Sequence, residues 1–183
     1  MPELSRIAAV SGQLHEHLLG AFAAPDWSGA VPTLSDSPGE DPSTEHGRCT
    51  LIVLLYHVAY NDEQRNVRPL RPFGATGVGE RLAMTLDLHY LVAAAAAQSF
   101  QAQALLERAC LRMHQAPIIS ASDTGQQEPL RFVPVARLPE ELLALWQGFG
   151  MAFRPSLAYR VAASIDRSDG GVSPLPVLQW PPV

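Results

Sequence analysis

The feature that most restricts the fold is an apolar run, TLIVLLYHVAY, from Thr50 to Tyr60. β-Branched and aromatic residues favour extended backbone, and this run is apolar on both of its alternating faces. We therefore expect an inner strand that is covered on two sides. A second strand is predicted from Leu82 to Ala93, because large apolar residues occupy every second position there.

The remaining patterns predict helices and further strands around this pair. Apolar residues recur every three or four positions in three segments, which is typical of helices with one buried side. Ser99 is a candidate N-cap for the middle helix. The expected helices cover 3–19, 99–115 and a segment from 138 to about Gly148 or Gly150, and the further strands cover 30–34, 130–135 and 157–165. This order predicts an α/β (α+β) fold, with about three helices packed on one mixed β-sheet.

The chain is expected to form a single domain over residues 1–167, followed by an extended tail over 168–183. Residues 23–47 are rich in Pro, Ser, Asp and Gly, so we expect a flexible loop there. The tail contains PLPVLQWPPV, and its prolines exclude a helix. No apolar run reaches the roughly 18 residues of a membrane span, and we expect the protein in the cytoplasm when it is made.

Composition excludes several function classes. The net charge is −5 and the basic residues are scattered, so nucleic acid is not an expected partner. The chain has no lysine, which excludes a Walker A loop and Schiff-base chemistry. Cys49 and Cys110 stand far apart in the sequence and are interpreted as buried thiols. No spacing of His, Cys or acidic residues predicts a metal site, and no cofactor is expected.

Asp87 and His89 are the polar pair that most resembles a reactive site. They lie two residues apart on one face of the predicted strand, with Cα atoms about 7 Å apart. A hydrolase could use such a pair, but polar pairs on a sheet more often hold neighbouring strands or a subunit interface together. We therefore expect Asp87 and His89 to be structural, while Leu86, Leu88 and Tyr90 fill the core on the opposite face.

Three sequence blocks, taken in order, resemble the signature of the tail-terminator, or cap, proteins of phage-tail-like contractile injection systems. The blocks are Leu54–Val58 leading to Asn61 and Arg65-Asn66, then Leu86–Leu91, then Arg154–Tyr159. Helical segments fall in matching order: Ile7–Val10, the helix with Leu105-Leu106 and Met113-His114, and the helix with Leu142, Leu145 and Trp146. The chain departs from the expected pattern in the Ala93–Ala97 run and in a long acidic loop from Asp36 to Glu45.

The resemblance implies a structural protein without enzymatic activity. It implies a homohexameric ring at the distal end of an inner tube and sheath, where the ring contacts the tube protein and the sheath protein and stops their elongation. Neither membrane nor nucleic acid is an expected partner, and the protein is expected to become part of the assembled particle. A small adaptor of the same particle is the alternative. The expected interface residues are Asn61, Arg65, Asn66, Arg68, Arg71, Asp87, His89, Arg154 and Trp180.

Overall fold

The computed structural model describes residues 5–23, 27, 29, 31–36, 49–61, 84–120 and 129–165. Three helices and six strands are assigned in these ranges. The helices are α1 (Arg6–Leu19), α3 (Ser99–Gln115) and α5 (Pro139–Gly148). The strands are β1 (Thr33–Ser35), β2 (Thr50–Tyr60), β3 (Met84–Ala95), β4 (Ile118–Ile119), β5 (Leu130–Val135) and β6 (Ser156–Ile165).

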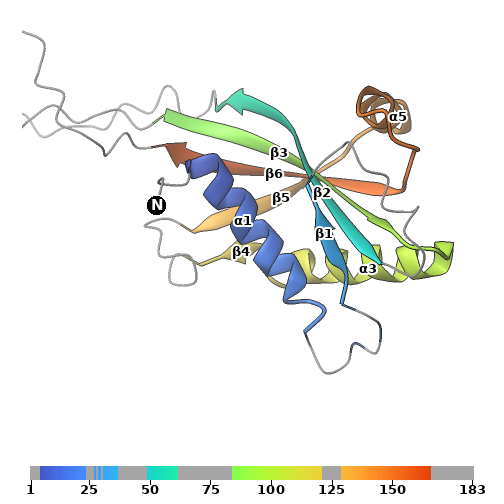
Figure 1. The fold of residues 1–183 in the computed structure, drawn as a ribbon. Coiled ribbons are helices and arrows are strands. Elements are labelled where there is room, and N and C mark those ends of the chain that lie inside the picture. The colour runs from blue at the N-terminus through green and yellow to red at the C-terminus, as the bar shows by residue number, and fades with distance from the viewer. Residues whose placement is uncertain are drawn as a thin grey trace, which may run out of the picture.

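The strands form one mixed sheet in the order β1-β2-β3-β6-β5-β4. The central ladder is antiparallel: β2 pairs with β3, and β3 pairs with β6 over ten residue pairs from Met84↔Ile165 to Ala93↔Ser156. Only β1 runs parallel to its neighbour β2. Figure 1 shows the sheet strongly twisted, with α1 and α3 on one side and α5 on the other. The long ladder is therefore the scaffold on which both faces are organised.

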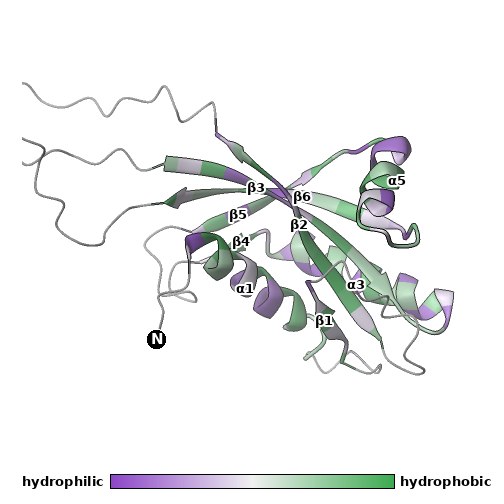
Figure 2. Ribbon diagram, turned by 45° about the horizontal axis from the view of Figure 1, so that its top comes forward, coloured by the Kyte–Doolittle hydropathy of each residue, from purple (hydrophilic) through white to green (hydrophobic). Residues whose placement is uncertain are grey.

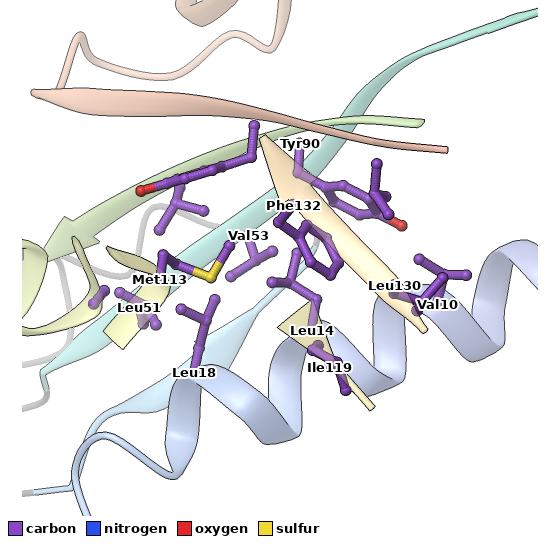
Figure 3. Close-up of a cluster of buried hydrophobic side chains, with 14 of the residues drawn as sticks. Val10, Leu14, Leu18, Leu51, Val53, Tyr90, Met113, Ile119, Leu130 and Phe132 are labelled. Carbon is purple, nitrogen blue, oxygen red and sulfur yellow. The ribbon is translucent and has the colours of Figure 1, made fainter. Parts of the chain in front are cut away.

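The first face of the sheet carries the main hydrophobic core. Alternate residues of β2 and β3 point toward α1 and α3, because side chains in a strand point to opposite faces in turn. Helix α1 contributes Val10, Leu14 and Leu18, each with no exposed surface. Figure 3 shows these three side chains beside Met113, Leu130 and Phe132 from the other elements of this layer. The mixed colouring of α1 and α3 in Figure 2 is that of helices with one buried side.

Polar contacts fix the two helices of this layer. Ser5 caps α1, since its Oγ accepts a hydrogen bond from the Ala8 backbone N–H at 3.3 Å. Two arginines of α3 reach the C-terminal end of α1, where Arg112 Nε donates to the His17 carbonyl at 3.3 Å and Arg108 Nε donates to the Ala21 carbonyl at 3.0 Å. These charged donors satisfy carbonyl groups that have no partner inside the helix.

Of the described helices, α5 covers part of the second face. Trp146 of α5 is fully buried against a smaller cluster that includes Ile52, Leu54, Leu91 and Ala158. Its indole Nε1–H donates to Ser156 Oγ at 3.2 Å, which attaches α5 to the start of β6. Towards the other end of β3, the residues on this face are Asp87 and His89, which are not in the α5 cluster.

The observed elements confirm the expected single α+β domain with three helices on a mixed sheet. The strand at Thr50–Tyr60 has the predicted bounds, and so do the helix at Ser99–Gln115 and the strand at Leu130–Val135. The short strand β1 begins at Thr33 rather than residue 30, and β4 was not predicted. Two residues give too short a pattern for periodicity to detect.

Other expectations require correction. Ser99 is the first helical residue rather than the N-cap; the cap is Gln98, and its side chain makes no capping hydrogen bond. Cys49 and Cys110 are free thiols but only partly buried. The inner strand is covered on both faces only in its first half, since Val58 and Tyr60 are 42% and 66% exposed.

Two further points concern expectations about membranes and the tail. Among the helices that the structure describes, none is long and apolar enough to cross a membrane. The proposed boundary at residue 167 and the tail at 168–183 lie outside the described residues, as does most of the loop at 23–47.

Candidate functional site

The candidate site is the part of the second sheet face that lies next to α5. Strand register places His57, His89, Arg160 and Val133 in one row across β2, β3, β6 and β5. Arg160 leaves 40% of its side chain exposed, and Val133 is 38% exposed. Four strands thus present a mixed polar and apolar row at an open sheet surface, which we call the polar row.

Asp87 lies beside this row and joins three elements. Its Oδ1 accepts a hydrogen bond from Asn61 Nδ2 at 2.8 Å, and its Oδ2 lies 3.4 Å from Arg160 Nη1. Asp87 and Asn61 are 8% and 6% exposed, so both are shielded from water. The carboxylate therefore links the end of β2 to β6 across β3. Asp87 thus contacts residues in and beside the neighbouring strands, and its place at a subunit interface stays a prediction.

His89 contacts rings rather than Asp87. Its ring centroid lies 5.2 Å from that of His57 and 5.9 Å from that of Tyr56. The pKa of His89 is lowered, first by burial and then by electrostatic interaction with His57 and Arg137, while Asp87 acts in the opposite direction. Its buried Nδ1 has no hydrogen-bond partner among the described residues. These surroundings therefore make protonation of His89 less favourable than protonation of a free imidazole.

A hollow of about 680 Å³ opens where α5 meets β2, beside the polar row. Tyr56 and His57 form its β2 wall, and Arg137, Glu141 and apolar residues of α5 form the other. Arg137 lies with its guanidinium carbon 5.7 Å from the Tyr56 ring centre, and its Nε donates to the Tyr56 hydroxyl at 3.2 Å. Glu141 pairs with Arg137 at 3.8 Å. The lining of the hollow thus combines ionic groups with apolar side chains.

This arrangement is suited to binding rather than to catalysis. Asp87 is engaged by Asn61 and Arg160, and neither Asp87 nor His89 lines the hollow. A general base must reach the proton that it removes, and a carboxylate held by two donors beneath a sheet surface does not meet that requirement. Within the described ranges, no three His, Cys, Asp or Glu side chains are grouped so that they could hold a metal ion.

The predicted interface residues divide into three groups. Asn61 and Asp87 are hydrogen-bonded to each other, while His89 lies on the same strand as Asp87 but contacts the ring of His57. Arg154 lies apart from them, partly buried in the segment between α5 and β6. Arg65, Asn66, Arg68, Arg71 and Trp180 lie outside the described residues.

Sequence reasoning missed Tyr56, His57, Arg137 and Arg160. Alternation along β6 could have placed Arg160 on the open face. The register shift between Leu55 and His57 could not have been read from the pattern, because a bulge of one residue changes which face each later side chain occupies. Arg137 comes from a segment about 80 positions further along the chain, and its hydrogen bond to Tyr56 has no local signal.

Comparison with solved structures finds similar chains, and two of them have low sequence identity to this protein. One, described as the sheath/tube terminator in the extended state of PVC, an extracellular contractile injection system, gives a TM-score of 0.59 at 16% identity. The other, the anti-feeding prophage cap, or AFP tube terminating cap, gives 0.61 at 17% identity. The matches cover 94% and 95% of this chain but only 61% and 60% of those chains. The likeness establishes a shared fold.

A search of curated proteins finds no match. A family model described as the Pvc16 N-terminal domain matches residues 7–179. The match runs from the first turn of α1 past the end of β6, so it spans the whole sheet and the three helices packed on it. The chain therefore belongs to the Pvc16 N-terminal domain family.

Proposed function

We propose that this chain is a non-enzymatic structural subunit that terminates the tube and sheath of a contractile injection system. The observation that carries the proposal is its fold, which is similar over more than nine-tenths of the chain to a sheath/tube terminator and to a tube terminating cap. The match to the Pvc16 N-terminal domain supports the same assignment. In this role the chain forms a homohexameric ring, contacts the tube and sheath proteins, and becomes a soluble component of an extracellular particle.

The polar row is the part of the described surface that we assign to these contacts. Arg160 and His57 are exposed there, while Asp87 and Asn61 fix the strands beneath them. Polar and charged side chains on a rigid sheet can select one partner and one register, because mismatched charges are costly at an interface. Arg154 and the predicted loop residues Arg65, Asn66, Arg68 and Arg71 extend the same proposal beyond this row.

The test measures assembly directly. The purified chain is expected to form rings, seen by mass measurement and by electron microscopy, and to bind one end of preassembled tubes. Added during tube growth, it should shorten the mean tube length. A chain that stays monomeric and leaves tube length unchanged contradicts the proposal. Binding only at the baseplate end would favour the adaptor role instead.

A further inference from the structure

Among the strands that the structure describes, none pairs with the outer edge of β2 in its second half. β1 pairs with it only at Thr50, Leu51 and Ile52, and no other described strand lies on that side. The residues just after this pairing are buried, with Val53 and Leu54 at 1% and 2% exposure. The accessible edge therefore extends from His57 to Tyr60. In Figure 1 it lies at the end of the sheet where β3 begins and β6 ends.

The backbone of this edge can be oriented from the ladder on its other side. The Asn61 N–H donates to the Thr85 carbonyl at 3.0 Å, so residue 61 points its main-chain groups toward β3. Alternate residues of an antiparallel strand point these groups to opposite sides. Val58 and Tyr60 therefore direct their N–H and C=O groups away from β3. The side chains of Val58 and Tyr60 are apolar and exposed. The same two residues therefore offer both main-chain hydrogen bonds and apolar contact to an added strand.

The sequence of β2 lacks the usual barriers to strand addition. Exposed edges are normally protected by charged residues or proline, and TLIVLLYHVAY contains neither Pro, Lys, Arg, Asp nor Glu. The opposite edge of the sheet differs. There β4 is two residues long, and β5 carries Pro134, which has no N–H to donate. Among the described strands, the β2 edge is therefore open to an added strand, whereas the β4 and β5 side of the sheet is poorly suited to one.

We propose that the His57–Tyr60 edge accepts the segment Val177–Trp180 of a neighbouring copy as an added strand. The segment is VLQW, a run without charge or proline between Pro176 and Pro181, and it matches the edge in length. If Leu178 and Trp180 face Val58 and Tyr60, period two places all four apolar side chains on one side. The segment lies outside the residues that the structure describes.

This contact rests on the ring of the proposed function and gives it a mechanism. A closed ring of identical subunits requires two different, complementary surfaces on each copy. An edge and an extended segment meet that requirement, and main-chain hydrogen bonds supply affinity in strand addition while alternate side chains supply specificity. The same pairing within one copy would fill the edge without joining subunits, so the experiment must separate the two cases.

The experiment uses the full chain with one change on each surface. Val58→Pro removes an outward N–H but no donor to β3, and Val58→Thr is its matched control. Gln179→Pro interrupts the donated segment, and Gln179→Thr is its control. Mass measurement of each variant, with far-UV circular dichroism to verify folding, is expected to show monomers for both Pro variants and rings for both Thr variants. Mixing the two Pro variants should restore a dimer, because one retains the segment and the other retains the edge.

Each result has a definite meaning. Rings that persist in both Pro variants overturn the strand contact but leave the proposed ring in place. If the Pro variants are monomeric and form no dimer on mixing, the edge pairs with the segment of its own copy, which contradicts the proposal. If the unmodified chain is itself monomeric at every concentration, the ring of the proposed function fails and this contact fails with it. Because Gln179 lies outside the described sheet, its variant remains informative even if Val58→Pro does not fold.

Discussion

Asn61 donates a hydrogen bond from its Nδ2 to Oδ1 of Asp87 at 2.8 Å, and both side chains are buried. The bond joins the residue after β2 to the middle of β3, where Arg160 also reaches the carboxylate from β6. An acid that suggested chemistry in the sequence thus holds three strands at the open end of the sheet. A buried carboxylate satisfied in this way stabilises the sheet only as long as its partners remain.

Asp87→Ala is expected to destabilise the fold by about 1–3 kcal/mol, because it leaves the buried amide of Asn61 without its acceptor. Asp87→Asn should cost less, since an amide oxygen can still accept that hydrogen bond. Arg160→Gln should cost under about 1 kcal/mol, because its side chain is 40% exposed and its ion pair is partly screened. The free energies of unfolding of the three variants in urea measure this order of destabilisation. Equal stability of Asp87→Ala and the unmodified chain would refute the role.

A second prediction concerns the contact between α1 and the sheet. The hydroxyl oxygens of Ser11 and Tyr90 lie 2.8 Å apart, and Tyr90 is 1% exposed. Burial also raises the pKa of Tyr90, so its hydroxyl stays protonated and available as a donor. A double-mutant cycle of Ser11→Ala and Tyr90→Phe should show a coupling of about 0.5–1.5 kcal/mol. If the two single substitutions change the free energy of unfolding additively in the double variant, the two hydroxyl groups form no specific hydrogen bond.

Trp146 supports the third prediction, on the attachment of α5. It is fully buried, and its indole donates to Ser156. Trp146→Ala should destabilise the fold by about 3–5 kcal/mol, as expected for removal of a large buried aromatic side chain. Leu143→Ala on the same helix is the control, because Leu143 is 44% exposed and should change stability by no more than about 0.5 kcal/mol. Similar midpoints of urea unfolding for the two variants would contradict the buried role of Trp146.

The helices and the longer strands could be predicted from the sequence because each is long enough to repeat its period. Alternation is visible in both β3 and β6, so both could be predicted as strands, although their ten pairs could not. Leu86, Leu88 and Tyr90 are buried as expected, since a strand with one face on the core fixes the face of every second residue. The short strand β4 has no such repeat.

The candidate site was only partly predictable. The pairing of Asp87 with His89 in the sequence suggested one shared role, yet Asp87 binds Asn61 and Arg160 while His89 contacts the rings of Tyr56 and His57. Those partners come from other strands, and register is set by tertiary packing and by the shift between Leu55 and His57. Local spacing carries no information on which strand will be the neighbour.

The last prediction concerns the pH dependence of stability. The folded pKa of His89 lies below its ordinary value of 6.5, first because of burial and then because of His57 and Arg137, with Arg160 also lowering it and Asp87 opposing them. The unfolded chain therefore binds this proton more readily than the folded chain does, and stability falls as the pH decreases through 6.5 toward the folded pKa. Between pH 7 and pH 5, unfolding in urea should become easier.

His89→Gln is the variant that tests this cause, because it keeps a polar side chain and removes the titrating ring. Its free energy of unfolding should change less between pH 7 and pH 5 than that of the unmodified chain. His15 also has a lowered pKa because of burial, with Asp36 opposing, so His15→Gln serves as a separate comparison and should remove a different part of the pH dependence. An unchanged slope in His89→Gln would show that the ring is protonated equally well in the folded and unfolded chain, which the surrounding positive groups and burial argue against.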